Sequence, residues 1–305
     1  MFRFLLRRLL VAVPTLFLVI TASFFMMHAA PGGPFDSERR LPPEVEKNIK
    51  AKYGLDKPLP VQYLNYVGGV LHGDLGPSLK YRDKTVVQII SENFPTSIRL
   101  GLSSLIIGVT IGIALGAIAA LRQNTGVDYG VTTFAILGIC VPTFVTAPLL
   151  VLVFAQTLDW FPTGGVSELK SYVLPVITLA LPQVAVVSRL TRAGMIEVLH
   201  SNYIRTARAK GLSEPRIVIR HALRAAVLPL VGYLGPATAG IITGSLVVER
   251  IFGMPGLGKF FVLSALQRDY TVVLGVVILY AVLVILLNLM AELIQAMLDP
   301  RIRFS

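Results

Sequence analysis

One string in the sequence, Gly253–Lys259, matches a nucleotide-binding motif. It reads GMPGLGK and satisfies the pattern G-x-x-x-x-G-K, in which backbone amides and the lysine hold the phosphates of a nucleotide. Phe260, however, occupies the position where a serine or threonine must bind magnesium, and Pro255 removes one of the amides that the phosphates would need. We therefore predict a bent turn at this string and no ATP site.

Residues that could serve as a nucleophile, a general base or a metal ligand are few. The chain has one cysteine, Cys140, and four histidines, of which only His28 is close to a long apolar stretch. Zinc sites need several ligands at short spacing, and the sequence contains no H-E-x-x-H motif. We therefore expect no catalytic residue, no metal site and no cofactor in this chain.

The most distinctive polar segment is a cationic stretch at residues 190–226. We expect Gly211 to follow the end of a short helix, and Ser213 to cap a second helix whose first turn holds Glu214 and Pro215. Two helices that meet at a corner would present cations to a partner. From charge alone, a solvated basic loop that enforces topology or contacts lipid is an equally good interpretation.

Six uncharged stretches of 17 to 28 residues surround this segment. Hydrophobic residues make up 54% of the chain and charged residues 15%, whereas about 25% are charged in soluble domains. A bilayer core about 30 Å thick requires about 20 apolar residues per helix. The sequence therefore predicts an all-α polytopic membrane protein with about six transmembrane helices, at Leu9–Met27, Leu100–Leu121, Val131–Leu158, Tyr172–Ser188, Val227–Val248 and Val272–Ala291.

The distribution of charge predicts the orientation. If the N-terminus is cytoplasmic, the cytoplasmic segments hold fourteen of the 28 Lys and Arg residues, and the short outer loops hold four. Cationic loops remain on the cytoplasmic side. We therefore expect both termini and residues 190–226 in the cytoplasm, and Gly253–Lys259 outside. The net charge of +11 reflects this topology, so nucleic acid is not needed to explain it.

The uncharged stretches and the charge distribution together divide the sequence into three regions. Residues 1–30 form the first transmembrane helix, residues 31–96 an extracytoplasmic cap with a helical stretch around Glu44–Tyr53, and residues 97–305 a core of five helices that includes the cytoplasmic loop 190–226. Residues 31–96 are too few to bury a large core of their own. We expect this cap to pack on the outer ends of the helices.

Small residues and prolines indicate how the predicted helices pack. A helix face with a small residue at every fourth position lets a neighbouring backbone approach closely, and the second stretch has one, at Ser104, Gly108, Gly112, Gly116 and Ala120. Prolines kink or break transmembrane helices, which often line cavities in transporters. They occur at Pro142, Pro148, Pro175, Pro182, Pro229 and Pro236. Ionisable residues near the predicted span ends, and not at their centres, argue against an ion-coupled carrier. These are Arg99, Arg189, Glu249 and Glu292.

The run Tyr203–Gly211, followed by Leu228–Pro229, resembles the EAA-loop signature of ABC-importer permease subunits. Ala207 and Gly211 keep the alanine-to-glycine step, and Arg205–Thr206 replaces Glu-Ala as in the peptide and nickel branch of that family. The resemblance covers nearly the whole chain and is greatest to the B-type membrane subunits of oligopeptide permeases. Further matches include Ala30–Pro31–Gly32, Gly73–Asp74–Leu75–Gly76, Phe94–Pro95–Thr96, Pro255–Gly256–Leu257–Gly258 and Arg268–Asp269–Tyr270.

This resemblance implies a type I ABC-importer permease fold in a bacterial inner (plasma) membrane. It implies a multi-pass subunit that forms half of an oligopeptide pathway, with a second homologous permease, two cytoplasmic ATPases that bind ATP and Mg²⁺, and an extracytoplasmic peptide-binding protein. The chain itself would not be an enzyme. By position, the helix that couples to the ATPases would comprise Tyr203, Ile204, Arg205, Thr206, Ala207, Arg208, Ala209, Lys210 and Gly211.

Other functions remain open at this point. Permeases for dipeptides, nickel or glutathione share these motifs, and a self-sufficient secondary carrier or channel is a candidate from another class. An intramembrane enzyme would need paired catalytic groups or metal ligands within the spans. The residues that line the substrate pathway are not identified by the sequence.

Overall fold

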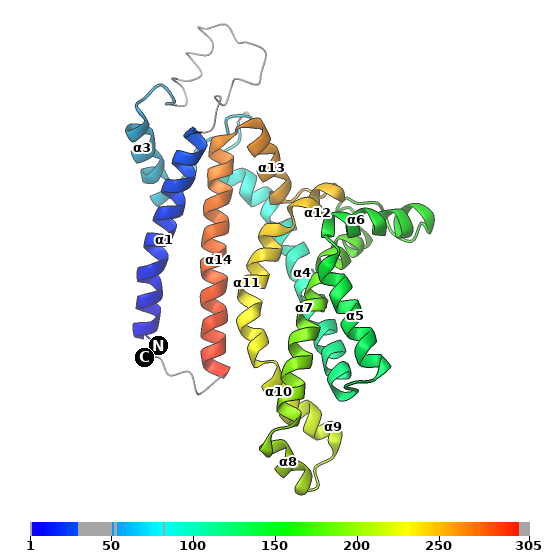
Figure 1. Cartoon of the computed structure of the whole chain (residues 1–305). Helices are drawn as coiled ribbons and strands as arrows, with labels where there is room; N and C mark the ends of the chain where they lie inside the picture. The colour runs from blue at the N-terminus through cyan, green and yellow to red at the C-terminus, as the bar shows by residue number, and fades with distance from the viewer. Residues whose placement is uncertain (1, 30–50, 52–53, 82, 299–305) are drawn as a thin grey trace. The chain divides into compact units, whose positions relative to one another are not determined.

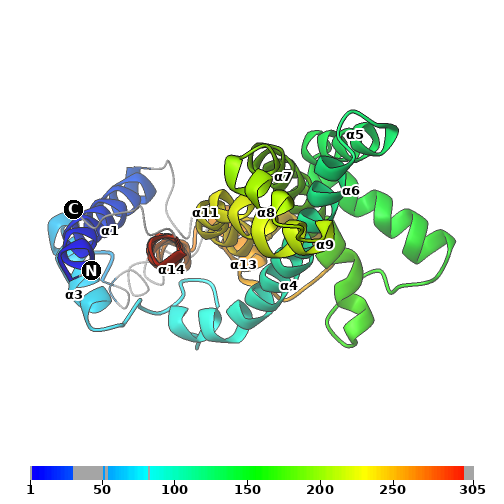
Figure 2. The same ribbon diagram turned by 90° about the horizontal axis from the view of Figure 1, so that it is seen from below.

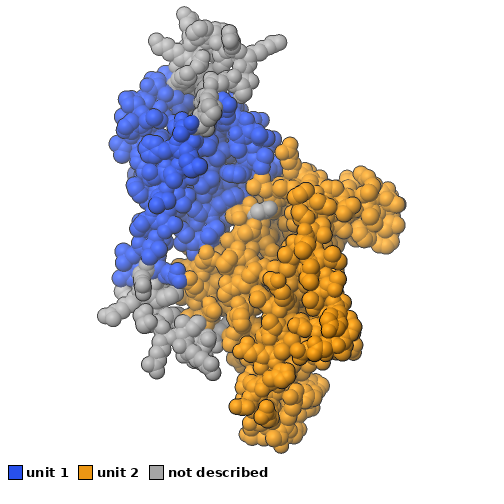
Figure 3. Space-filling model, viewed as in Figure 1, with its two compact units in different colours: residues 1–96, 255–285 blue, residues 97–254, 286–305 orange. Residues whose placement is uncertain are grey.

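The computed structural model describes residues 2–29, 51, 54–81 and 83–298. Within these ranges the structure is helical, with one isolated antiparallel bridge between Pro77 and Thr85, and the predicted all-α fold is confirmed. The predicted helical stretch around Glu44–Tyr53 falls almost entirely outside the described residues. The chain divides into two compact units, shown in Figure 3: unit 1 is Met1–Thr96 with Pro255–Ile285, and unit 2 is Ser97–Met254 with Leu286–Ser305.

Unit 1 contains both complete helices and parts of longer ones, labelled in Figure 1. They are α1 (Phe2–Ala29), α3 (Leu59–Leu71), the start of α4 (Val86–Leu121), α13 (Leu257–Gln267) and the larger part of α14 (Tyr270–Leu298). Its core brings together side chains from α4, α13 and α14, which are far apart in the sequence. The fully or almost fully buried members are Val86, Ile89, Leu257, Val272 and Val276.

A buried carboxylate joins the loop before α4 to the start of α14. Asp269 is fully buried and accepts hydrogen bonds from the Ser78 hydroxyl and from the amides of Leu79 (3.1 Å) and Lys80 (3.2 Å). The Thr271 hydroxyl donates to the same carboxylate at 3.0 Å. A buried charge is tolerated only when it has such partners. Asp269 therefore fixes two distant parts of unit 1 to each other.

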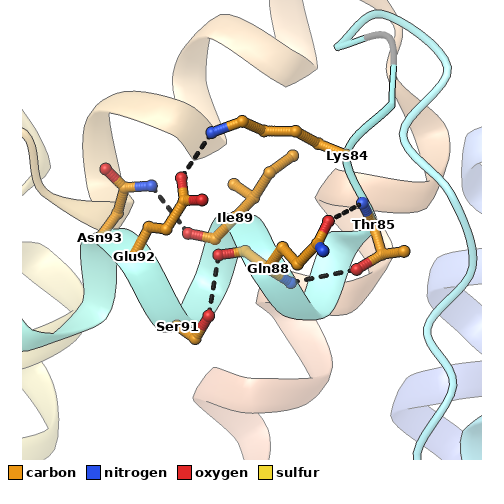
Figure 4. A network of polar contacts seen from close by, with 7 residues as sticks. All are labelled: Lys84, Thr85, Gln88, Ile89, Ser91, Glu92 and Asn93. Atoms are coloured by element: carbon orange, nitrogen blue, oxygen red, sulfur yellow. Dashed lines mark hydrogen bonds and ion pairs between the residues drawn. The ribbon is translucent and has the colours of Figure 1, made fainter.

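Helix α4 begins fourteen residues before the predicted span Leu100–Leu121, so that boundary is wrong as a helix start. The Gln88 amide donates to the Thr85 hydroxyl at 3.2 Å, and the Thr85 amide donates to the Gln88 side chain at 2.9 Å. This reciprocal capping, visible in Figure 4, starts the helix at Val86. Charged residues such as Glu92 end an apolar stretch but not a helix, because their side chains can remain at the surface.

Unit 2 contains the remaining helical elements. In chain order these are the rest of α4, α5 (Gly126–Cys140), α6 (Thr143–Leu150), η1 (Val151–Thr157), η2 (Leu169–Tyr172), α7 (Val173–Leu199), α8 (Asn202–Ala209), α9 (Glu214–Arg216), η3 (Ile217–Ala222), α10 (Leu223–Ala226), α11 (Leu228–Gly244), α12 (Leu246–Ile251) and the end of α14. The short elements α8, α9 and α10 lie at one end of the long helices α7 and α11 (Figure 1).

The four-residue spacing of small residues predicted close approach by a neighbouring helix, and in the structure that helix is α7. A Cβ atom added at Gly108 would lie 2.5 Å from the Cβ of Gln183, and one at Gly112 would lie 2.6 Å from the Cβ of Val187. Real Cβ contacts are not that short. Glycine at these positions therefore allows the two helices to approach more closely than any other residue would.

The predicted third span, Val131–Leu158, is not one straight helix. Helix α5 ends at Cys140, and α6 with η1 continues after Pro142 at an angle of 103°. The predicted break at a proline is confirmed at this position, where Pro142 has no amide to continue the helix. Five other helices are long and apolar enough to cross a membrane, or six spans in all if the bent pair counts as one; this holds for the described residues.

Two more boundaries differ from the prediction. Helix α7 runs to Leu199, beyond the predicted end at Ser188, because arginines at the end of an apolar stretch do not interrupt backbone hydrogen bonding. The fifth span extends through α12 to Ile251, and the predicted turn at Gly253–Lys259 leads into the apolar helix α13, which begins at Leu257.

We predict that Gly112→Ala lowers the free energy of unfolding by about 1–3 kcal/mol, the usual cost of overpacking a tight contact. Gly130→Ala is the matched control, because an added Cβ there meets nothing within 4 Å and alanine favours a helix by up to about 1 kcal/mol. Thermal unfolding of the purified chain measures both effects. Equal melting temperatures for the two variants would contradict the proposed role of the α4–α7 contact.

Candidate functional site

The corner at residues 190–226 begins with the last turns of α7, which ends at Leu199. Ser201 has extended backbone angles and occupies the N-cap position of α8, although its side chain forms no capping hydrogen bond. At the other end of α8, Gly211 has a φ of 78°, its amide donates to the Arg208 carbonyl at 2.9 Å, and the Leu212 amide donates to the Ala207 carbonyl at 3.3 Å. These two bonds form a Schellman motif, in which glycine is favoured because of its positive φ. The prediction that Gly211 follows the helix end is confirmed.

The second half of the corner also begins as predicted. Ser213 occupies the predicted N-cap position with extended backbone angles, although its side chain forms no capping hydrogen bond, and Glu214 with Pro215 forms the first turn of α9. The segment then continues through the π-helical η3 into α10 and stops at Val227, immediately before α11. Pro229 lies in the first turn of α11, where its missing amide is tolerated. Figure 2, which views this end of the unit, shows α8 and α9 in front of the longer helices.

Helix α8 has one buried side and one exposed side. Ile204 and Ala207 are buried three positions apart, and they pack with Met195 of α7 and with Ile217 and Ala222 of η3. The remaining residues of the predicted coupling segment are exposed: Tyr203, Arg205, Thr206, Arg208, Ala209, Lys210 and Gly211. An apolar stripe at this spacing holds a helix on its support. Helix α8 is therefore attached to α7 and η3 by its inner side and presents its cations outward.

An ion pair crosses the corner. The Arg208 guanidinium donates to the Glu214 carboxylate at 2.7 and 3.3 Å, and this contact holds the pKa of the Glu214 carboxyl below its ordinary value. A lowered pKa in the folded state means that the pair stabilises the corner above the ordinary pKa of glutamate, and that this contribution is lost as the pH falls through the lowered value. Both side chains are exposed, so the contribution is small.

A second ion pair, between α5 and α7, was not foreseen from the sequence. Arg192 donates two hydrogen bonds to Asp128, at 2.5 and 2.7 Å, and the Asn124 amide also donates to this carboxylate, at 2.9 Å. Asp128 is 2% exposed. An aspartate in a first helical turn is a common sequence signal, but the sequence did not indicate its partner 64 positions away. The pair joins the start of α5 to the part of α7 that leads into α8.

Glu249 is a further buried carboxylate that sequence analysis placed only near a span end. It lies near the end of the candidate span Leu228–Ile251, as expected, but it is fully buried and accepts hydrogen bonds at 2.6 Å from the hydroxyls of Ser97 and Ser245. Ser97 is on α4, so the carboxylate links α4 to α12. The link to α4 was not recognisable from the sequence, because Ser97 is 152 positions away from Glu249.

The string that resembled a nucleotide-binding loop has a packing role. Gly256 is the cap residue of α13, Leu257 is fully buried in the core of unit 1, and Phe260 packs against that core. Phe260 is the residue that replaces the magnesium-binding serine or threonine, and here it supplies apolar contact. The predicted turn is therefore present as far as Gly256, after which the chain is helical.

Comparison with protein families identifies the chain. Residues 112–304 match the family described as binding-protein-dependent transport system inner membrane component, and residues 1–101 match the N-terminal part of such membrane components. The chain belongs to this permease family. Its members are membrane components of transport systems, which agrees with the long apolar helices described above.

Curated relatives of this permease align over its full length. The oligopeptide transport system permease protein OppB of Salmonella typhimurium (strain LT2) is 53% identical over 100% of both chains, and that of Haemophilus influenzae is 51% identical over 100% of both. The dipeptide transport system permease protein DppB of Bacillus subtilis (strain 168) is 42% identical, covering 99% of this chain and 98% of the relative.

Solved structures show that the permease shares the fold of ABC-importer membrane subunits. An inward-facing structure of the MetNI methionine ABC transporter has a TM-score of 0.57 and 16% identity, and covers 69% of this chain and 96% of the other. A bacterial ABC transporter that imports the acidic polysaccharide alginate has a TM-score of 0.54 and 16% identity, and covers 83% and 99%. The predicted ABC-importer fold is therefore confirmed.

We predict that Asp128 and Arg192 are energetically coupled. Asp128→Ala and Arg192→Ala should each destabilise the permease, but the double variant should be less destabilised than the sum, with a coupling energy of about 0.5–3 kcal/mol. Each single change removes one partner of a largely buried ion pair. Denaturant unfolding of the four proteins measures the coupling.

The exposed ion pair between Lys84, in the loop before α4, and Glu92 of α4, drawn in Figure 4, provides the matched control. Its two side chains are about half exposed, so the same cycle should give a much smaller coupling energy. Additive effects of Asp128→Ala and Arg192→Ala would show that the α5–α7 pair does not stabilise the fold.

Proposed function

We propose that the chain is the membrane-spanning permease subunit of an ATP-driven importer of oligopeptides and forms half of its translocation pathway. The observation that carries this proposal is the 53% identity, over the full length of both chains, to a protein named as an oligopeptide transport permease. Relatives named as dipeptide permeases are 40–42% identical. The comparisons therefore favour oligopeptides over dipeptides, and they do not favour nickel or glutathione.

A self-sufficient secondary carrier or channel is also not favoured. The family is described as part of binding-protein-dependent transport systems, so its members act with other proteins. We propose four partners: a second homologous permease, two cytoplasmic ATPases and an extracytoplasmic peptide-binding protein. In this arrangement the ATPases bind ATP with Mg²⁺ and hydrolyse it, and the permease itself is not catalytic.

The orientation that we propose follows from the charge distribution. Both termini and the corner at residues 190–226 face the cytoplasm, where cationic loops remain. Residues 31–96 then form an extracytoplasmic cap, close to where the binding protein would dock, and residues 97–305 form the core. The fold supports this arrangement in one respect, because the short elements α8, α9 and α10 of the corner lie at one end of the long helices α7 and α11 (Figure 1).

Within this system, we assign the ATPase contact to Tyr203–Gly211. The exposed side of the segment Tyr203–Gly211 carries three cations, Arg205 and Arg208 in α8 and Lys210 at its C-terminal cap, and the buried side of α8 is packed on α7 and η3. A short helix fixed in this way moves as one body with its support. A push from a partner on α8 would therefore be transmitted to α7, and through Asp128–Arg192 to α5.

Ala209→Trp tests this assignment without disturbing the support of α8. Ala209 is exposed, so the large side chain should leave the melting temperature unchanged, but it should obstruct a docked partner. We expect ATP-dependent oligopeptide uptake by the reconstituted transporter to fall about tenfold or more, which corresponds to about 1.4 kcal/mol of lost docking free energy. Co-purification of the ATPases should decrease in parallel.

Arg216→Trp is the matched control, because Arg216 is exposed in the same corner but lies outside α8. It should retain uptake and ATPase binding. Gly211→Val adds a second test: nothing lies within 4 Å of its Cβ in the isolated chain, so the added cost comes from the positive φ and from any docked partner. Normal uptake by both Ala209→Trp and Gly211→Val would refute the assignment of α8.

A further inference from the structure

A cavity lies among helix α8, the segment formed by η3 and α10, and the first turns of α11. Its volume is about 500 Å³, within the range of sites that hold small ligands. It is formed by one residue of α8 and by consecutive parts of η3, α10 and α11. The lining residues are Tyr203, Arg220, His221, Arg224, Ala225, Val227, Leu228 and Val231.

The polar part of this cavity carries positive charge that has no protein partner. Among residues 2–29, 51, 54–81 and 83–298, no hydrogen bond or ion pair engages the side chains of Arg220 and Arg224. Both arginines are exposed, and the Tyr203 ring is 48% exposed. Two guanidinium groups beside a hydroxyl form a donor set suited to a phosphate, which accepts several hydrogen bonds at once.

The apolar part of the cavity continues into a candidate membrane span. Leu228 and Val231 are partly buried and belong to the first turns of α11, where the span Leu228–Ile251 begins. The cavity therefore changes from cationic residues in η3 and α10 to apolar residues at the first turns of α11, where the candidate span Leu228–Ile251 begins. A ligand that matches both halves has a phosphate at one end and an acyl chain at the other.

We propose that this cavity binds the headgroup of an anionic phospholipid from the cytoplasmic leaflet. The phosphate is held by Arg220 and Arg224, and the first carbons of the lipid lie against Leu228 and Val231. This rests on the orientation under the proposed function, which places the corner at the cytoplasmic surface. Basic pockets between transmembrane helices on that side are suited to anionic headgroups. A free phosphate shares the polar contacts but not the apolar ones.

The position of the cavity gives the lipid a consequence for transport. Tyr203 belongs both to the cavity lining and to α8, the helix assigned to the ATPase contact. A bound headgroup therefore contacts the outer side of α8 as well as η3, and it neutralises cations that repel one another. The anionic lipid would hold α8 in a fixed position before a partner docks.

The test uses the assembled transporter in nanodiscs of phosphatidylcholine with or without phosphatidylglycerol. Lipid retained by the complex is measured by native mass spectrometry for the wild type and for Arg220→Gln/Arg224→Gln. Two cations near a membrane surface correspond to about a 30-fold change in affinity, so the variant should retain about 30-fold less phosphatidylglycerol. Arg122→Gln/Arg216→Gln loses the same charge from exposed positions outside the cavity and should retain the lipid normally.

Three outcomes would overturn the proposal. Equal loss in both double variants would show a general charge effect, and full displacement of the lipid by inorganic phosphate would show a phosphate site without a lipid. Retention by the permease pair but not by the complete transporter would show that an ATPase covers the cavity. Melting temperatures of both double variants should match the wild type, since the two cavity arginines are exposed.

Oligopeptide uptake by the same preparations separates this inference from the proposed function. If the transporter takes up oligopeptides but wild type and Arg220→Gln/Arg224→Gln retain equal amounts of phosphatidylglycerol, only the lipid site is refuted. Specific retention with no oligopeptide uptake would refute the substrate assignment alone. If both inferences hold, phosphatidylglycerol should raise uptake by the wild type and by Arg122→Gln/Arg216→Gln, but not by Arg220→Gln/Arg224→Gln.

Discussion

The close packing of α4 on α7 is the contact on which the geometry of unit 2 depends. Helices in lipid gain little from hydrophobic burial against each other, so close van der Waals contact through small residues supplies much of their attraction. Gly108 and Gly112 bring α4 onto Gln183 and Val187. Because α7 continues directly towards the corner, the same contact that positions α7 in the bundle also positions α8 at the surface.

Polar groups complete this framework at the ends of the helices. Asp128–Arg192 joins α5 to α7 near the corner, and Glu249 links α4 to α12 through Ser97. In unit 1, Asp269 has the corresponding role at the start of α14. Each carboxylate is buried and each has several donors, which is the condition under which a buried charge does not destabilise a fold. Apolar packing brings the helices together, and the hydrogen bonds of these three carboxylates fix how they are aligned.

The sequence predicted features that depend on neighbouring residues. The four-residue spacing that includes Gly112, the helix end at Gly211 and the break at Pro142 are all local patterns with one physical cause each. It missed features that depend on distant residues, such as the partners of Asp128 and Glu249. The start of α4 was missed for another reason: charge was used to end the stretch, although the cap at Thr85 determines where the helix begins.

The bend after Pro142 has a consequence for how the bilayer meets the protein. Helix α5 has fifteen residues and so is about 22 Å long, shorter than a hydrocarbon core of about 30 Å. The segment that follows turns by 103° and adds little height. At this edge of unit 2 the apolar segment is therefore shorter than the hydrocarbon core. If only lipid covers the edge, the bilayer has to become thinner there. A neighbouring protein surface would relieve that deformation, so membrane thickness should influence how firmly this edge is covered.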